Sequence, residues 1–332
     1  MRRKRLIRDA PRTHIVWVIS QCTDDARRRT RRWIAAVLMM VLIAGSCRKT
    51  HEEGPAPPSA PLGACVTPLR LREYLATTAP LLLLDLRRAA DYDEAHLPGA
   101  LSLPLSALLP RGTEIPDAAR RTTIANALEK TGVRPGLEIV VIDEGSREGF
   151  LRSAAGCWAL ELAGVPTCHV LEGGIDGWRR AKGEVAQARY TPRERHALTI
   201  PEHPPAWTSL EQLRKALTDG EIALVDLRDE SAKQLLPGAT RVRLLDAVGD
   251  DGRLDRAELE RKAIAAGLFD EIRCVLIGED AIDATAAWFL LSRELGRAGV
   301  SVFPGGFALY ASHPGLPKKS ARRRLDAPLN GP

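Results

Sequence analysis

The sequence predicts an α/β protein with two similar domains, each an open, mostly parallel sheet with helices on both faces. Its 332 residues exceed the usual size of one domain. Short apolar runs alternate with amphipathic stretches, as strands and helices do in α/β folds. The motifs of the first half also recur in the same order in the second half, which indicates a duplicated unit.

The repeated motifs identify the strands of both copies. Apolar runs at 81–86 and 222–228 each carry the start of an Asp-Leu-Arg motif, at 85–87 and 226–228, and such runs suit parallel strands that are buried on both faces. Three further pairs follow: Leu-Pro-Gly-Ala at 97–100 and 236–239, apolar runs at 139–143 and 274–278, and Gly-Gly at 173–174 and 305–306. This order supports the same fold for both copies.

Helix signals open each copy. Thr67 precedes Pro68, which fits an N-cap followed by proline at the first helical position. In the second copy, Thr208 and Glu211 have the spacing of a capping box. Further helices are expected over 118–131, 151–162 and 284–295.

The chain divides into six segments on composition and repetition. They are a signal with a lipobox-like cysteine (1–47), a Pro-rich tether (48–64), the first domain (65–188), a linker (189–205), the second domain (206–316) and a disordered basic tail (317–332).

The first segment predicts export. An arginine-rich run at 27–32 precedes thirteen uncharged residues at 33–45, which is shorter than the roughly twenty that span a bilayer. Ala-Gly-Ser-Cys at 44–47 resembles a bacterial lipobox, which implies a lipid on Cys47 and a membrane-anchored protein facing the periplasm or cell exterior. A buried helix and an uncleaved anchor are alternatives, and residues 30–34 partly resemble a twin-arginine signal, so the export route is open.

Charge argues against a nucleic-acid partner. The net charge of +6 combines +10 in residues 1–50, +4 in residues 317–332 and −8 in residues 51–316. The folded part is therefore acidic, so a basic, aromatic-interleaved surface of the kind that binds nucleic acid is not expected there. The basic tail can touch anionic lipid.

Six cysteines bear on redox state and on metal binding. Cys22 would be lost with the signal and Cys47 would be lipidated, which leaves Cys65, Cys157, Cys168 and Cys274 in a compartment that can be oxidising. Their spacings match no zinc pattern. The acidic residues at 143–148 and 278–283 could bind a cation, but three acids in a loop are more often a solvated surface, so neither a metal nor a cofactor is expected. A disulfide among the four is possible, and the sequence does not choose the pair.

Several of these residues together resemble a known family. Asp-Leu-Arg at 85–87, residues 95–100, the strand–loop–helix at 139–162 and Leu-Glu-Gly-Gly at 171–174 with Trp178 resemble a rhodanese domain. The second copy resembles another, with Tyr310 in place of Trp178. Over about residues 66–316 the arrangement is similar to tandem thiosulfate and 3-mercaptopyruvate sulfurtransferases.

The resemblance implies where a nucleophile should lie. This family transfers sulfur through a Cys thiolate in a six-residue loop after the fourth strand, and the corresponding positions here are Asp143 and Gly278. The loops at 143–148 and 278–283 each carry three acids, which repel a thiolate and thiosulfate alike. The candidate ligand-loop residues are Asp143, Glu144, Gly145, Ser146, Arg147, Glu148, Gly278, Glu279, Asp280 and Asp283.

The function expected from this pattern is binding rather than catalysis. Ligands of open α/β sheets lie beyond the carboxyl ends of the strands, where both loops fall, so an unidentified protein or a small anionic or sulfur-containing ligand is expected there. The alternative is a thiosulfate or 3-mercaptopyruvate sulfurtransferase that uses another cysteine. Cys274 is a poor substitute, because four residues of strand would separate it from Gly278 by roughly 13 Å. A phosphatase-like activity is the least favoured reading, since it also needs a loop cysteine.

Three polar residues outside the loops are expected to support the fold. His96 should hold the turn before Leu-Pro-Gly-Ala, while Asp85 and Asp226 should accept hydrogen bonds at the ends of buried strands.

Overall fold

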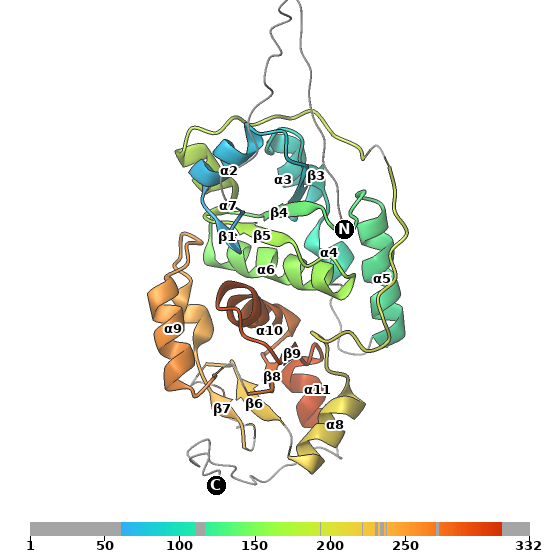
Figure 1. Ribbon diagram of the computed structural model, residues 1–332, viewed down its shortest axis with the longest axis vertical. Coiled ribbons are helices and arrows are strands. Elements are labelled where there is room, and N and C mark those ends of the chain that lie inside the picture. The colour runs from blue at the N-terminus through green and yellow to red at the C-terminus, as the bar shows by residue number, and fades with distance from the viewer. Residues whose placement is uncertain are drawn as a thin grey trace, which may run out of the picture. The chain divides into compact units, whose positions relative to one another are not determined.

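A computed structural model describes residues 61–109, 117–192, 194–220, 222–229, 232, 236, 238–269 and 272–313. The signal, Cys47, most of the tether and the basic tail lie outside these residues. The described residues form two α/β domains in succession, each built on its own parallel sheet (Figure 1). No helix within the described ranges is long and apolar enough to cross a bilayer.

The first domain contains a five-stranded sheet in the order β1-β5-β4-β2-β3, and all its pairings are parallel. Its elements are β1 (Cys65–Val66), α2 (Pro68–Leu75), β2 (Leu81–Asp85), α3 (Ala89–Glu94), β3 (Leu101–Ser102), α4 (Leu105–Leu108), α5 (Asp117–Glu129), β4 (Glu138–Ile142), α6 (Arg147–Leu162), β5 (Cys168–Leu171) and α7 (Gly174–Arg180).

The second domain contains a four-stranded parallel sheet in the order β7-β6-β8-β9. Its elements are α8 (Leu210–Asp219), β6 (Ala223–Asp226), β7 (Thr240–Arg241), the 3-10 helix η1 (Leu244–Ala247), α9 (Arg256–Ala265), β8 (Cys274–Ile277), α10 (Ala281–Trp288), the π-helix η2 (Phe289–Glu294), β9 (Val300–Val302) and α11 (Gly306–Ser312).

Both faces of the central strand β4 are buried, as the continuous apolar run predicts. Ile139 and Val141 belong to one apolar cluster, and Val140 and Ile142 belong to another on the opposite face. Successive side chains of a strand point to opposite faces, so an all-apolar strand requires cover on both. The predicted fold class is confirmed: each sheet is parallel and carries helices on both faces.

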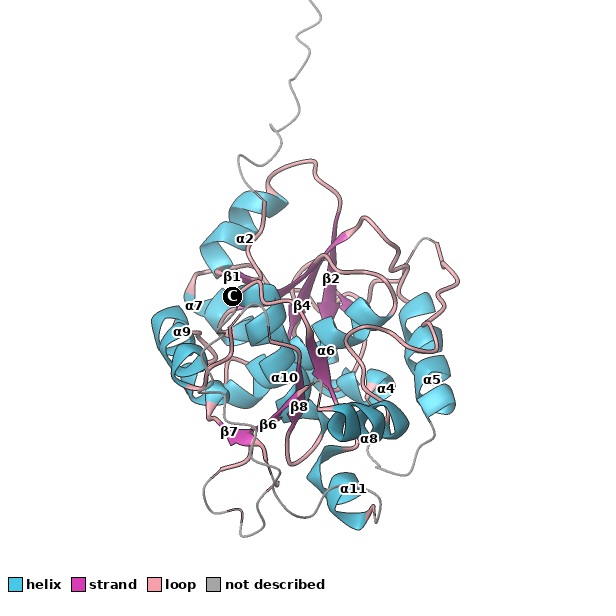
Figure 2. Cartoon of the chain, turned by 60° about the horizontal axis from the view of Figure 1, so that its bottom comes forward, coloured by secondary structure: helices cyan, strands magenta, loops and turns pink. Residues whose placement is uncertain are grey.

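The largest core cluster extends through both domains. It joins residues of α6, including Trp158, to residues of α10 and η2, including Phe289. Helices α6 and α10 lie against each other between the two sheets (Figures 1 and 2). Almost all residues of α6 after its first turn are buried, because one side packs on its own sheet and the other on the second domain. A helix that is apolar all round is typical of such a position.

The first residues of the second domain, which follow the linker directly, are also packed against α6. The indole N–H of Trp158 donates to the Ala206 carbonyl at 2.9 Å, and the Trp158 and Trp207 rings stack with centroids 5.4 Å apart. This contact fixes the end of the linker to the first domain before α8 begins.

The helix-start predictions are partly confirmed. Thr67 caps α2 by accepting a hydrogen bond from the Arg70 amide, as predicted. The sequence predicts the capping box of α8 at Thr208 and Glu211, but the structure forms it one residue later, with Ser209 and Gln212. Thr208 is unavailable as the cap because its hydroxyl pairs with the Ser301 hydroxyl at 2.7 Å.

Two predicted helices differ in their bounds. The stretch expected over 151–162 begins four residues earlier, because Ser146 is its N-cap. The stretch expected over 284–295 begins at Ala281 as α10 and continues as the π-helix η2.

Candidate functional site

The first candidate loop joins β4 to α6. Asp143 follows the strand and is fully buried, while Ser146 caps α6 by accepting from the Gly149 amide at 3.1 Å. The helix therefore begins at Arg147, and only residues 143–146 are loop. The last two residues of the six-residue segment lie in the first helical turn.

Asp143 is held by an arginine of its own domain. Arg152 donates to the two carboxylate oxygens of Asp143 at 3.0 and 2.6 Å and reaches Glu144 at 3.1 Å. Burial raises the pKa of Asp143, and the hydrogen bonds from Arg152 oppose that rise. The Asp143 hydrogen bond likewise raises the pKa of Arg152. Asp143 is thus a buried carboxylate whose charge is balanced by an ion pair with Arg152.

The second domain covers part of this first loop. The Arg147 guanidinium donates to the Val248 carbonyl at 2.8 Å and to the Leu245 carbonyl at 2.9 Å. The Arg147 amide donates to the Asp250 carbonyl at 3.2 Å. Gly252 has φ +70° and passes so close that an added Cβ would lie 2.8 Å from the Ser146 carbonyl oxygen. The one basic residue of the loop thus serves the contact between domains.

The second candidate loop joins β8 to α10 and is one residue shorter. Asp280 caps α10 by accepting from the amides of Ile282 and Asp283 at 2.8 and 3.4 Å. Only residues 278–280 are loop, and Asp283 already lies in the first helical turn. Glu279 and Asp280 are exposed, so this loop presents carboxylates to solvent.

Gly278 sits where the resemblance implies a nucleophile, and its surroundings are tight. A Cβ at Gly278 would lie 2.7 Å from the Asp283 Cβ and 2.9 Å from the Asp280 carbonyl oxygen. Real Cβ atoms do not approach backbone atoms so closely, so a side chain at position 278 would require the loop to move. The glycine is therefore required by the close approach of the first turn of α10.

Asp283 is the most perturbed carboxyl group of this loop. Burial, together with the charges of Asp280 and Glu279, raises its pKa to about 6. No hydrogen bond or ion pair within the described residues joins the first candidate loop to the second. The acids therefore lie together within each loop, and the two loops form separate candidate sites.

Neither free thiol in the described ranges lies in a loop. Cys274 is buried at the start of β8, where burial raises the pKa of the thiol to about 12. Cys65 lies in β1, where burial and then Glu294 raise the pKa of its thiol well above the usual range. A nucleophilic cysteine needs a lowered pKa, so both environments oppose thiolate formation.

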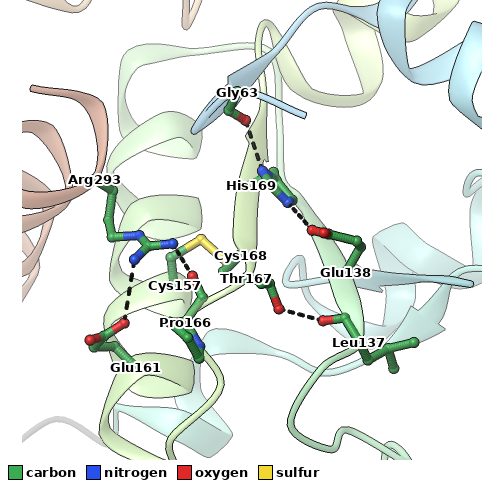
Figure 3. Close-up of a disulfide and its surroundings, with 10 residues drawn as sticks. All are labelled: Gly63, Leu137, Glu138, Cys157, Glu161, Pro166, Thr167, Cys168, His169 and Arg293. Atoms are coloured by element: carbon green, nitrogen blue, oxygen red, sulfur yellow. Dashed lines mark hydrogen bonds and ion pairs between the residues drawn. A yellow bond between two sulfur atoms is a disulfide. The ribbon is translucent and has the colours of Figure 1, made fainter. Parts of the chain in front are cut away.

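The remaining two cysteines form a disulfide that the sequence could not choose. Cys157 of α6 is bonded to Cys168 of β5, with Cα atoms 5.4 Å apart, and both are buried. Figure 3 shows that the crosslink lies beside a contact with the second domain. There, Arg293 of η2 donates to the Pro166 carbonyl and lies 3.8 Å from a carboxylate oxygen of Glu161.

The polar residues expected to support the fold do so. Arg87 binds both carboxylate oxygens of Asp85, and Arg228 binds both of Asp226. The Asp-Leu-Arg motif therefore forms the same buried ion pair in each copy. Burial opposes ionisation of Asp226, but the hydrogen bonds from Arg228 and then Arg241 outweigh it and lower the pKa of Asp226.

His96 is fully buried and holds chain segments together. Its ring nitrogens lie 2.7 Å from the Tyr92 carbonyl and 2.9 Å from the Ala188 carbonyl, and its ring stacks on that of Tyr92. Within the described part of the chain, no group of three or more His, Cys, Asp or Glu residues is arranged to hold a metal ion.

Sequence reasoning missed three features of these sites. No sequence pattern pointed to Arg152, because its pairing with Asp143 depends on where α6 begins, and the N-cap Ser146 was not predicted. The Cys157–Cys168 pairing and the contact made by Arg293 depend on which elements lie side by side. Spacing within the sequence does not contain that information.

Comparison with known proteins agrees with this architecture. The rhodanese-like domain family matches the chain twice, over residues 67–181 and 209–313. A putative thiosulfate sulfurtransferase of Mycobacterium tuberculosis is 24% identical over 212 residues, covering 56% of this chain and 72% of that protein. A thiosulfate sulfurtransferase of Azotobacter vinelandii is 25% identical over 280 residues, covering 78% and 97%.

A solved structure shares the fold. The 3-mercaptopyruvate sulfotransferase SseA from Escherichia coli superposes with a TM-score of 0.61 at 21% identity, covering 74% of this chain and 99% of that one. The two family matches span well over half of the chain and coincide with its two parallel sheets. The protein therefore belongs to the rhodanese-like domain family, in the two-domain arrangement found among its thiosulfate and 3-mercaptopyruvate sulfurtransferase relatives.

Proposed function

We propose that this protein is an exported, membrane-anchored member of its family whose paired domains bind a partner and do not transfer sulfur. The observation that carries the proposal is the environment of Gly278. The position lacks a thiol, and the loop around it has closed to a distance at which a side chain does not fit. A persulfide carrier needs both the sulfur and a cradle of amide donors around it.

The other cysteines support the same proposal. Both free thiols in the described ranges have raised pKa values and lie in strands, away from the loops. A sulfurtransferase that used either of them would need a thiolate in surroundings that disfavour it.

Export is supported by the disulfide as well as by the N-terminal sequence. Disulfides such as Cys157–Cys168 persist in oxidising compartments and are rare in the reducing cytosol of most organisms. A lipid on Cys47 would place the domains at the membrane surface. The test is mass spectrometry of the mature N-terminus purified from membranes. A chain that is neither lipidated at Cys47 nor cleaved near it contradicts this part of the proposal.

The second loop is the binding face that the geometry favours. Glu144 and Glu148 of the first loop are exposed as well, but that loop is packed against residues 245–252 and Glu144 pairs with Arg152. Glu279 and Asp280 of the second loop are exposed and adjacent. Two adjacent carboxylates beyond the carboxyl end of a parallel strand suit a partner with a basic segment. A photo-crosslinking amino acid at position 279 should capture that partner in intact cells, while one at Glu260, exposed on α9, should not. Equal capture from both positions contradicts this placement.

Catalysis is tested by thiosulfate:cyanide sulfur transfer on the full chain. The expected result is no turnover above the uncatalysed rate. Turnover that is abolished by Cys274→Ser or Cys65→Ser would instead establish the alternative, a sulfurtransferase with a non-standard nucleophile. Retention of the wild-type Tm in both variants would show that any loss of turnover is not a loss of folding.

A further inference from the structure

The first helix after the tether belongs to a surface that combines exposed leucines with cations. On α2, Leu69 and Leu75 are 56% and 41% exposed, and Arg72 is also exposed. Beside it, α7 ends in Arg179 and Arg180, and Lys182 follows; all three are exposed. The α2–α7 face is defined here as these six residues: Leu69, Arg72, Leu75, Arg179, Arg180 and Lys182.

The two helices form one surface because they are joined directly. The Arg72 guanidinium donates to the Ala181 carbonyl at 3.3 Å. Pro68 lies so close to Gly177 that a Cβ there would meet the Pro68 ring at 3.5 Å. Figure 1 shows α2 and α7 next to each other in the first domain. The leucines and cations therefore keep a fixed arrangement.

Lys182 is unusual in its backbone conformation. Among the described residues, it is the one non-glycine with positive φ, at +58°. The comparable residues after other helices, such as Gly164 and Gly220, are glycines. A side chain in this conformation costs free energy, and such outliers concentrate at functional positions. Cations here also complement the C-terminal end of the α7 dipole, but that effect does not explain the neighbouring exposed leucines.

The charge of this face contrasts with that of the rest of the folded part. Residues 68–76 and 174–185 together carry five Lys or Arg and three Asp or Glu, although residues 51–316 sum to −8. Four other large apolar side chains are exposed among the described residues: Val185 follows α7, Tyr190 lies in the linker, and a second pair, Ile264 and Phe269, lies in residues 258–271, which carry four acids and two bases. Exposed leucines among cations suit an anionic lipid surface, whereas the second pair suits it poorly.

The position of the face in the chain points to the same partner. The described chain begins at Pro61 and reaches α2 at Pro68, and thirteen residues separate Pro61 from Cys47. Fully extended, that stretch spans at most roughly 50 Å. A lipid on Cys47 would therefore hold the first domain close to the bilayer, where tethering raises the effective concentration of a weakly binding face.

We propose that the α2–α7 face lies against the anionic surface of the membrane that carries the lipid anchor, with Leu69 and Leu75 inserted at the headgroup boundary. The proposal rests on the anchoring part of the proposed function and adds the orientation of the domains. The first domain faces the bilayer through α2 and α7.

The experiment uses the full chain in vesicles of phosphatidylethanolamine with about 30% phosphatidylglycerol. A photo-crosslinking amino acid replaces Leu69 in one protein and Ile264, which is equally exposed at 56%, in the matched control. The yield of lipid adduct, measured by mass spectrometry, should be at least about fivefold higher from position 69. It should fall towards the control in vesicles of phosphatidylcholine alone, or when Arg179, Arg180 and Lys182 are each replaced by Gln.

Equal adduct yields from positions 69 and 264 would overturn the proposal, as would a yield from position 69 that ignores lipid charge. Crosslinks from position 69 to a second copy of the chain would also overturn it, because they would make the face a dimer contact. Flotation with the vesicles is measured in parallel for the full chain without the photo-crosslinking amino acid. Failure to float counts against the anchor, whereas flotation without lipid adducts at position 69 counts against the face alone.

Discussion

Asp283 occupies the space that a side chain at Gly278 would need, because a Cβ at position 278 would lie 2.7 Å from the Asp283 Cβ. The absence of a cysteine in this loop is therefore coupled to the shape of the loop. Three loop residues, of which Asp280 is the last, precede α10, whereas four residues precede α6. The earlier start of α10 brings its first turn over Gly278. Restoring the sulfur alone should not restore the site.

Gly278→Cys should destabilise the protein without producing sulfur transfer. Overpacking of this kind costs about 1–3 kcal/mol in the free energy of unfolding, measured by urea denaturation. Ala281→Cys, in the same segment but at a residue that already has a Cβ, is the matched control and should cost less. Adding Asp283→Gly to Gly278→Cys should recover part of the loss. A Gly278→Cys variant as stable as wild type would show that the loop opens easily.

Removing the guanidinium of Arg147 should weaken the contact between the domains. It donates to two backbone carbonyls of the second domain, and its side chain is about one-third exposed. Arg147→Gln should therefore lower the free energy of unfolding by about 1–2 kcal/mol. Arg88→Gln removes an exposed pair within α3 and should change it by under about 0.5 kcal/mol. Equal effects in differential scanning calorimetry would argue against this role for Arg147.

Loss of the disulfide should destabilise the first domain. The bond closes a loop of eleven residues, and opening a loop of this size costs about 2–3 kcal/mol. The double variant Cys157→Ala/Cys168→Ala should show this loss in urea denaturation, and reductant should then have no further effect on it. The free-thiol variant Cys274→Ala serves as a control for reductant effects elsewhere. Unchanged stability of the double variant would mean that the crosslink is dispensable for folding.

The raised pKa of Asp283 should make stability depend on pH between about 4 and 6. Its folded pKa of about 6 lies above the usual value of 3.8, so the folded state binds the proton more tightly than the unfolded state. Its contribution to stability is therefore lost as pH rises through about 6 and regained as pH falls towards 4. Asp283→Asn should raise Tm at pH 7.5 and reduce the slope of Tm between about pH 4 and 6. An unchanged slope would contradict the shift.

The pKa of Asp226 is shifted in the opposite direction, so its effect on stability has the opposite dependence on pH. The hydrogen bonds from Arg228 and Arg241 lower its pKa despite burial, so its contribution is present above pH 4 and is lost as pH falls below that value. The two aspartates can thus be separated in one pH titration of Tm. Asp226→Asn should lower Tm at pH 7 and have a smaller effect near pH 3.

The sequence by itself determined the repeated α/β architecture. Buried parallel strands and N-caps are local patterns: the all-apolar run of β4 and the Thr67-Pro68 pair each predict their element without reference to the rest of the chain. The sequence also predicted that Asp85 and Asp226 accept hydrogen bonds at the ends of buried strands, and the structure shows that the arginine two residues further on is a donor in both copies.

Only the tertiary structure decided how the two loops differ. The pairing of Cys157 with Cys168, the covering of the first loop by residues 245–252 and the closure of Asp283 over Gly278 depend on how helices pack after their caps are set. One residue of difference in the start of a helix rotates its first turn by about 100°. That rotation leaves no sign in composition or motif spacing, yet it sets the space that is left around Gly278.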